Sequence, residues 1–380
     1  MRGWIEEHAE KIGARAEREL EALVGISSPS GDVRGAEECA AICATLLPDG
    51  SEVERVPCAS PGHAPDLIGT VRGTGRHRLL LLGHVDTVIG HESHQPLLRE
   101  DGRLKGSGTI DMKGGVVLSL GVMRALAQRR EDFAEASILL VCDEEWRTEP
   151  FAHVGRFAGY DACLCFEGGE MTAGGTEGVV VKRKGAATVR IDATGVASHS
   201  GSAPDHGRNA LLALAAVAQA VATRHDPTGE HRLTAVPTVM RAGDAFNVVP
   251  GHGELLCDLR ADDENAFHAV MAAIPPEHGG VKLDAQILRI WPGMDSRDAT
   301  LGLLERASAH LGRTVEGVTR GGASDASHFA SSIPITIDGL GPRGGAAHNP
   351  EEYVIPESLR TRAEVALSIA DALLAGEPRQ

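Results

Sequence analysis

The sequence predicts an α/β protein in which a mainly parallel sheet flanked by helices holds an inserted ferredoxin-like α+β domain. Three observations lead to this prediction. Short, continuously apolar runs alternate with helical patterns in the first part of the chain, which is typical of an α/β domain. The pattern then changes between about 185 and 292 to the order β-α-β-β-α-β. A further apolar run follows that section, so the first domain is completed only after the insertion.

Composition limits the kind of protein. The 380 residues carry 37 Lys and Arg against 53 Asp and Glu, a net charge of −16, and 42% are apolar, so we expect two soluble domains. The acidic balance and 3% aromatic content argue against nucleic-acid binding. A charged N-terminus and the lack of a long apolar stretch predict no membrane span and a cytoplasmic protein. The seven cysteines include no C-x-x-C pair and are expected to be free thiols.

The catalytic part of the chain is expected to comprise residues 1–184 and 293–380. Apolar residues at helical spacing predict helices over 5–24 and 33–47. Apolar runs of four to six residues are typical of parallel strands buried on both faces. The runs lie at 78–82, 137–141, 162–166 and 333–337.

The inserted section, 185–292, is expected to be a lid or dimerisation domain. Its elements are predicted as strand 187–193, helix 208–223, strands 232–240 and 252–260, helix 262–273 and strand 281–290.

Ionisable residues follow three of the buried strands. Because ligands bind at the carboxyl ends of strands in open α/β sheets, these residues indicate a site. Histidine nitrogen and carboxylate oxygen are ligands for zinc, and a pair of metals needs a bridging carboxylate. Each residue also has a simpler explanation; Asp111, for example, could cap a helix over 112–127. The conjunction favours a metal site made from His84, Asp86, Asp111, Glu144, Glu145, Glu167 and His348.

Four ordered motifs carry a resemblance to a known family. They are LGHVDTV at 82–88, GSGTIDMKGG at 106–115, DEE at 143–145, and His348 followed by EEYV at 351–354. Together they resemble the dinuclear zinc amidohydrolases, the superfamily of glutamate carboxypeptidase, acetylornithine deacetylase and succinyl-diaminopimelate desuccinylase. The similarity extends from about residue 20 to residue 375.

The resemblance implies two divalent metal ions, most simply zinc, with cobalt and manganese left open. Asp111 would bridge them and precede a cis peptide bond. Asp86 would orient a histidine ligand, and Glu144 would be the general base acting on a metal-bridging hydroxide. The implied ligands are His84 and Glu167 at one metal, Glu145 and His348 at the other, and Asp111 at both.

The inserted domain and one later loop supply the implied substrate contacts. His199, in GVASHSG at 195–201, would stabilise the oxyanion, and Asn247 would contact the substrate amide. Arg260 suits a bidentate hold on a substrate carboxylate. Ser324, in GGASDA at 321–326, is also assigned to substrate contact.

The expected reaction is hydrolysis of an amide bond next to a free carboxylate in a short peptide or an N-acyl amino acid. The run at 339–348 resembles the glutamate carboxypeptidase subgroup, which favours a carboxypeptidase. A deacylase of the acetylornithine or succinyl-diaminopimelate type remains the alternative. The broadly apolar helix near 211–217 fits either core packing or a homodimer through the lid.

Two other classes of function stay open. The protein could keep the fold as a binding module without catalysis, although every expected ligand and Glu144 are retained. It could also be a serine amidohydrolase that uses Ser324 with Asp325, but this hypothesis lacks a positioned base.

Overall fold

The computed structural model describes residues 2–147 and 149–376, which form two compact units. Unit 2 comprises Arg183–Met294 and Arg320–Ala323, and unit 1 contains the other described residues. The return of 320–323 to unit 2 was not expected from the sequence. It is held there by a hydrogen bond from the Arg183 guanidinium to the carbonyl of Gly322, at 2.8 Å.

Unit 1 is built on a six-stranded sheet in the order β1-β2-β6-β3-β7-β19. The last four strands in this order are parallel, whereas the β1–β2 and β2–β6 pairs are antiparallel. The four predicted apolar runs are the four parallel strands. The strands are β1 (Glu52–Val56), β2 (Asp66–Arg72), β3 (His77–His84), β6 (Phe133–Val141), β7 (Ala162–Cys165) and β19 (Ile335–Ile337).

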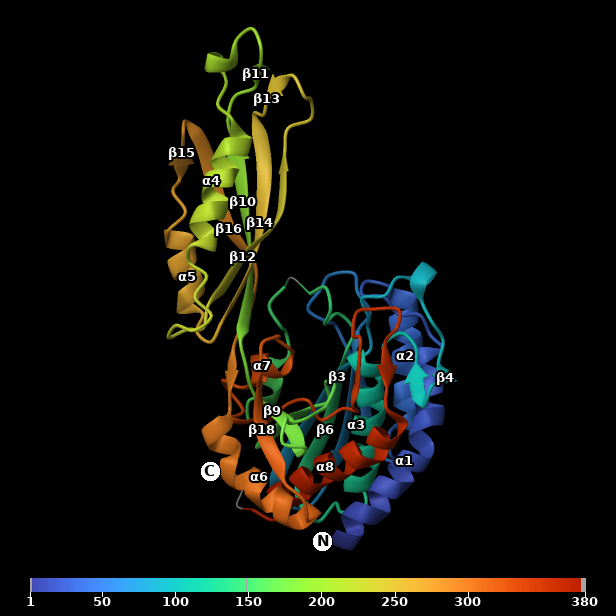
Figure 1. Ribbon diagram of the computed structural model, residues 1–380. Coiled ribbons are helices and arrows are strands. Elements are labelled where there is room, and N and C mark those ends of the chain that lie inside the picture. The colour runs from blue at the N-terminus through green and yellow to red at the C-terminus, as the bar shows by residue number, and fades with distance from the viewer. Residues whose placement is uncertain (1, 148, 377–380) are drawn as a thin grey trace. The chain divides into compact units, whose positions relative to one another are not determined.

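Both faces of this sheet are buried, as continuous apolarity requires. Along β3, Leu79 and Leu81 join the main core, and Leu80 and Leu82, which point to the other face, are equally inaccessible. Helices α1, α3 and α8 pack on one another, and α3 contacts β3 and β6 (Figure 1). None of the described helices combines the length and apolarity needed to cross a membrane. The helices of unit 1 are α1 (Arg2–Val24), α2 (Val33–Leu46), α3 (Gly114–Leu126), α6 (Arg297–Leu311), α7 (Ala326–Phe329) and α8 (Pro356–Leu374).

Two small sheets complete unit 1. One contains β8 (Glu170–Met171), β9 (Glu177–Arg183), β17 (Met294–Asp295) and β18 (Val315–Arg320). The other has the order β20-β21-β5-β4, with β4 (Leu98–Glu100), β5 (Arg103–Lys105), β20 (Gly344–Gly345) and β21 (Tyr353–Val354). This second sheet joins the segment after His348 to the segment before Asp111, because β21 pairs with β5.

Unit 2 has the predicted ferredoxin-like order, with an antiparallel sheet β12-β14-β10-β16-β15 against which α4 and α5 pack. Alternate residues of β10, such as Val189 and Ile191, point into its core. The predicted fold class is therefore confirmed. The elements are β10 (Gly185–Thr194), β11 (Ser198–His199), α4 (Ala210–Ala222), β12 (Thr234–Ala242), β13 (Val248–Val249), β14 (His252–Ala261), α5 (Asn265–Ala272), β15 (Glu277–His278) and β16 (Val281–Trp291).

Candidate metal centre

The carboxyl ends of three neighbouring parallel strands bring the first site residues together. His84 is the last residue of β3, which lies between β6 and β7 in the sheet. Glu144 and Glu145 follow β6, and Glu167 follows β7. Since these strands run in the same direction, their ends meet at one edge, and the histidine is flanked by carboxylates on both sides.

The buried imidazole of His84 is oriented by Asp86. Its Nδ1 lies 3.0 Å from the backbone carbonyl oxygen of Asp86 and 3.3 Å from the carboxylate, so Nδ1 carries a proton. The other nitrogen, Nε2, faces Asp111 at 3.1 Å and Glu167 at 3.7 Å. Burial alone would lower the pKa of His84, but the hydrogen bonds with Asp111 and Asp86 raise it well above its ordinary value. The surrounding carboxylates thus favour positive charge at this point.

Asp86 has a second structural task. Its two carboxylate oxygens accept hydrogen bonds from the backbone N–H groups of Glu144, at 3.2 Å, and Glu145, at 3.1 Å. The carboxylate is fully buried, so these bonds are not exchanged with water. One side chain therefore fixes both the histidine at the end of β3 and the turn after β6.

Asp111 lies between two histidines. Its Oδ1 is 3.1 Å from Nε2 of His84, and its Oδ2 is 3.0 Å from Nε2 of His348. The alternative interpretation of Asp111 as a helix cap is wrong, because α3 begins at Gly114 and Lys113 occupies the cap position. The expected cis peptide bond between Asp111 and Met112 is present.

The glycine pair of the GSGTIDMKGG motif has a steric reason. A Cβ atom at Gly115 would lie 1.8 Å from the carbonyl oxygen of Phe166, far inside any real contact. Only glycine allows the start of α3 to approach the end of β7 so closely. This close approach sets the segment that carries Asp111 against the segment that carries Glu167.

His348 completes a second group of potential ligands. Its Nε2 lies 3.3 Å from the Glu145 carboxylate as well as 3.0 Å from Asp111. Hydrogen bonds with these two carboxylates raise the pKa of His348 to about 10. The backbone of His348 is left-handed, with φ of 62°, an uncommon conformation that is found at functional sites.

The arrangement fits a pair of divalent cations. Among the described residues, Oε1 of Glu145 is buried without a hydrogen-bond partner, which leaves a carboxyl oxygen for a cation to bind. Imidazole nitrogen and carboxylate oxygen are ligands that zinc accepts. Within each of the two groups the ligand atoms lie within 4.8 Å of one another. The groups are His84, Asp111 and Glu167, and Asp111, Glu145 and His348.

Glu144 has the properties of a group that transfers protons. Burial raises the pKa of its carboxyl well above the ordinary value. The charge of His84 lowers this pKa, whereas the negative charges of Asp325, Glu145 and Glu167 raise it further. A carboxyl group with a raised pKa takes up a proton more readily than an ordinary carboxylate, which suits a general base. Glu144 also lies beside His84 and Glu145, with ligand atoms within 4.8 Å.

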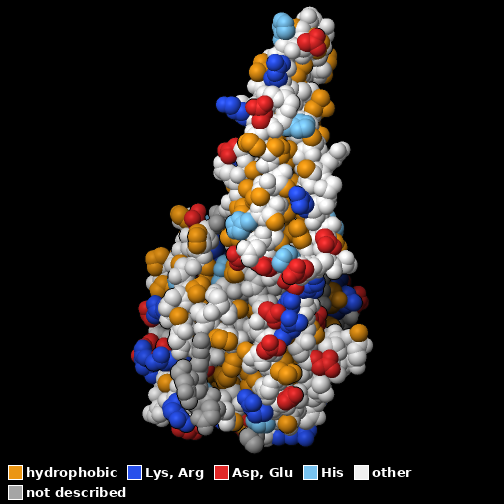
Figure 2. Space-filling model, turned by 90° about the vertical axis from the view of Figure 1, so that its left-hand side faces the viewer, with side chains coloured by type: hydrophobic (Ala, Val, Ile, Leu, Met, Phe, Trp, Pro, Cys, Tyr) orange, Lys and Arg blue, Asp and Glu red, His pale blue; other side chains and the backbone are white. Residues whose placement is uncertain are grey.

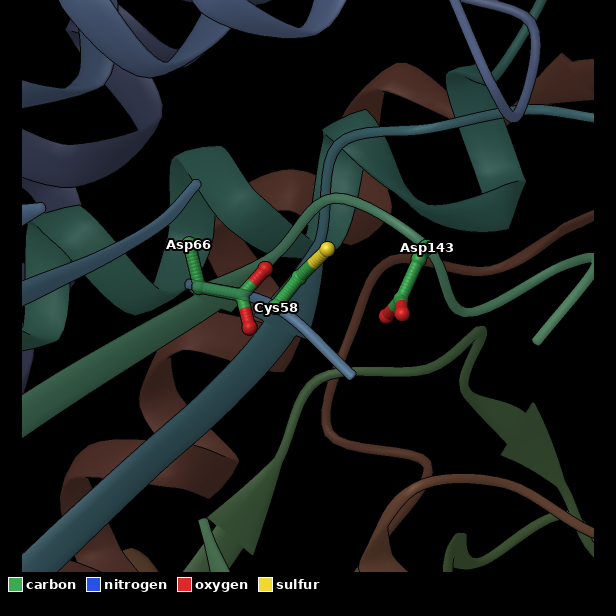
Figure 3. Close-up of side chains that lie close together, drawn as sticks. All are labelled: Cys58, Asp66 and Asp143. Carbon is green, nitrogen blue, oxygen red and sulfur yellow. The ribbon is translucent and has the colours of Figure 1, made fainter. Parts of the chain in front are cut away.

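A separate group of Cys58, Asp66 and Asp143 also places potential ligand atoms within 4.8 Å (Figure 3). Here every carboxylate oxygen already accepts a hydrogen bond. Asp66 accepts from Cys142 and contacts His153, and Asp143 accepts from Ser60 and Arg147. Burial and the two carboxylates raise the pKa of the Cys58 thiol to about 12, which keeps it protonated. This group is a hydrogen-bond network.

Two predicted substrate contacts lie together in unit 2. His199 and Asn247 are brought together because β11 pairs with β13, and the Ser200 N–H donates to the Asn247 carbonyl at 3.0 Å. The Nδ1 of His199 accepts hydrogen bonds from the N–H groups of Gly201 and Ser202, both at 3.1 Å. In the neutral ring the proton is therefore on Nε2, and this exposed nitrogen is a donor.

Arg260 and Ser324, the other two predicted substrate contacts, lie in different units of the chain. Arg260 lies near the opposite end of β14, where it pairs with Ala186, and its Nε donates to Asp258. Ser324 is buried in unit 1, and its hydroxyl donates to Asp338 at 2.6 Å. The prediction that Ser324 contacts substrate is not supported by this position. The hypothesis of a serine hydrolase that uses Ser324 with Asp325 is also not supported, because the Ser324 hydroxyl is buried and donates to Asp338.

Sequence reasoning assigned no role to two buried groups beside the site. Arg147 is 1% exposed and binds Asp143 and Asp325, and its spacing of four residues from Asp143 was a signal for this pair. Glu352 is 2% exposed and accepts hydrogen bonds from the loop that contains Asp111. Glu352 lies in the EEYV motif at 351–354, but the motif did not indicate that its carboxyl group binds the backbone of another loop.

Known proteins resemble this chain along most of its length. Residues 80–372 match the family described as peptidase family M20/M25/M40. Carboxypeptidase G2 from Pseudomonas sp. (strain RS-16) is 28% identical, over 94% of this chain and 89% of that protein. A succinyl-diaminopimelate desuccinylase from Burkholderia vietnamiensis is 30% identical, over 80% of this chain and 85% of its own. The structure of aminopeptidase PepT from Bacillus cereus has a similar fold, with a TM-score of 0.76, 22% identity, and coverage of 95% of this chain and 98% of that one.

Proposed function

Because the chain belongs to peptidase family M20/M25/M40 and is thus a metallohydrolase, we propose that it hydrolyses an amide bond next to a free carboxylate, as a glutamate carboxypeptidase does. The observation that carries this proposal is the Asp111 carboxylate, which presents one oxygen to His84 and the other to His348. The relation to a desuccinylase supports a second candidate, an N-acyl amino acid deacylase.

The proposed cofactor is a pair of zinc ions. His84 and Glu167 would hold one, Glu145 and His348 the other, and Asp111 both. When bound, the metals supply an acidified water molecule and polarise the scissile carbonyl. Cobalt and manganese accept the same donors, so the choice of zinc rests on the mixture of imidazole and carboxylate ligands.

Glu144 is the proposed general base. It would take a proton from the attacking water and return it to the leaving amine, which requires a carboxyl group whose pKa lies above its ordinary value. Asp86 supports this role because it holds the backbone of Glu144 while it orients His84. One buried carboxylate thus sets the distance between base and ligand.

His199 is proposed to stabilise the oxyanion that forms on the substrate carbonyl. Its Nδ1 is occupied by two backbone N–H groups, so Nε2–H points outward as a preformed donor. Asn247 would contact the substrate amide from the same pair of strands. Arg260 would hold the substrate carboxylate. Its Nε donates to Asp258, and its planar guanidinium suits a two-point contact with a carboxylate.

The distances within unit 2 support a homodimer. The eight residue steps of β14 from His252 to Arg260 span about 27 Å, and His199 lies beyond the His252 end. Figure 1 shows β11 and β13 together at that end of unit 2. Within one copy, Arg260 and His199 are therefore too far apart to contact the same small substrate. We propose that a second copy supplies one of them. Leu211 and Leu212 on α4 are exposed. Figure 2 shows that one face of the molecule carries exposed hydrophobic side chains between charged ones.

Mixing two inactive variants tests this arrangement. His199→Ala and Glu144→Ala homodimers are each expected to have lost most activity. If His199 acts on the site of the other copy, a mixed dimer contains one intact site, and an equimolar mixture recovers about a quarter of wild-type turnover. The variants are unfolded and refolded together, and turnover is compared with each refolded alone. Failure of the mixture to exceed its components, in a preparation shown to be dimeric, would show that the second copy does not supply His199.

Metal content and substrate class are tested together. We expect about two metal ions per chain by elemental analysis, and turnover that a chelator abolishes and added zinc restores. The substrate panel contains N-acylglutamates, dipeptides that end in glutamate, acetylornithine and N-succinyl-diaminopimelate. Preference for the glutamate compounds supports the carboxypeptidase, and preference for the last two supports the deacylase. A reconstituted protein that binds no metal would overturn the proposed function.

A further inference from the structure

Glu352 places a buried carboxylate under the loop that carries Asp111. Its side chain accepts three hydrogen bonds, all from backbone N–H groups of this loop. Oε2 accepts from Gly108 at 2.7 Å, and Oε1 accepts from Ile110 at 2.7 Å and from Asp111 at 2.9 Å. With its oxygens turned to the backbone, Glu352 belongs to neither ligand group found among the described residues.

The backbone of Glu352 is tied to the loop of His348. Its N–H donates to the carbonyl of Asn349, and its own carbonyl accepts from the N–H of Gly106, both at 3.0 Å. Tyr353, the next residue, pairs with Lys105 in the small sheet. The residue therefore joins two segments that are 241 positions apart in the sequence.

These contacts determine what the Asp111 side chain can reach. An N–H fixed by Glu352 sets the position of the Asp111 backbone, and the carboxylate then meets His84 and His348 at 3.1 and 3.0 Å. A bridging ligand must match two positions at once, so it tolerates little displacement. We infer that Glu352 is a positioning residue for the metal pair: it clamps the Asp111 loop to the His348 loop so that one carboxylate faces both metal positions.

This inference rests on the metal centre of the proposed function, but it concerns metal binding and needs no knowledge of the substrate. Glu352→Gln keeps the volume and one acceptor oxygen but turns an NH₂ group towards the N–H of Gly108. Glu352→Ala removes the acceptors for all three N–H groups. Glu351→Gln is the matched control, because Glu351 is exposed and contacts Lys105 at the surface.

The experiment titrates zinc into metal-free protein by calorimetry and measures thermal unfolding with and without metal. We expect Glu352→Gln to fold and to bind metal about 10- to 100-fold more weakly than wild type. The rise in Tm on metal addition should shrink in Glu352→Gln, and shrink further in Glu352→Ala if that variant folds. Glu351→Gln should match wild type in both measurements.

Three results would overturn the inference. Glu352→Gln could bind metal with wild-type affinity, or its Tm could fall below that of wild type by the same amount with and without metal. It could also fail to fold, which would assign Glu352 to folding in general. Absence of metal binding in the wild type is a different result, because it removes the proposed function itself.

Discussion

Replacing Glu144 by glutamine is expected to lower kcat by about 10²- to 10⁴-fold while fold and metal content stay unchanged. Glutamine has nearly the same shape but cannot take a proton from water. The backbone N–H of residue 144 still donates to Asp86, so the turn that carries Glu145 is retained. The measurement is kcat at saturating substrate, together with elemental analysis and circular dichroism of the same preparation.

Two neighbouring variants make this result specific. Glu145→Gln is expected to lose metal as well as activity, because Glu145 contacts His348 and holds the unpaired oxygen. Glu149→Gln, an exposed residue of the same loop, should behave as wild type. If Glu144→Gln kept most of its turnover, or lost activity only in proportion to lost metal, Glu144 would not be the base. A binding module would show no turnover in wild type either.

Replacing Arg147 by methionine is expected to reduce the free energy of unfolding by about 3–5 kcal/mol. Arg147 is 1% exposed, with its two outer nitrogens 2.5 and 2.8 Å from Asp325 and its Nε 3.1 Å from Asp143. Its guanidinium also lies over the ring of Phe151, at 4.5 Å. Methionine fills much of the volume but leaves two buried carboxylates without a cation.

Urea unfolding of metal-free protein measures this effect. Arg72→Met is the control, since Arg72 and Glu52 form an exposed pair, and its removal should leave stability nearly unchanged. A triple variant with Arg147→Met, Asp143→Asn and Asp325→Asn removes the uncompensated charges and should recover part of the loss. A loss in Arg147→Met as small as that in Arg72→Met would show that the buried ion pairs contribute little.

The parallel part of the sheet could be predicted because its strands are buried on both faces. Continuous apolarity in the four parallel strands β3, β6, β7 and β19 can be recognised in the sequence without knowledge of their partners. The antiparallel edge could not be predicted in this way. β1 exposes four of its five residues, so neither alternation nor apolarity marks it as a strand.

Three of the predicted metal ligands, His84, Glu145 and Glu167, could be placed together because each lies at or just after the end of one of three parallel strands. The family resemblance, confirmed by the match to residues 80–372, supplied the order of the motifs. Their supports could not be predicted in the same way. Asp325 lies 178 positions from Arg147, and Glu352 binds backbone groups rather than side chains. The burial of Ser324 could not be predicted either, because nothing in the sequence identified Asp338 as its hydrogen-bond partner.

Unit 2 is entered through β10 and left through β16, and these strands are antiparallel neighbours in which Ala186 lies opposite Trp291. The main segment of unit 2 therefore begins and ends at two neighbouring strand positions, where Cα atoms are about 5 Å apart. Residues 320–323 join the unit separately. We therefore expect the segment between these two positions to be an exchangeable cassette, which a short turn or a domain from another protein could replace. Substrate range could then change through the cassette while the metal-binding segments keep their sequence.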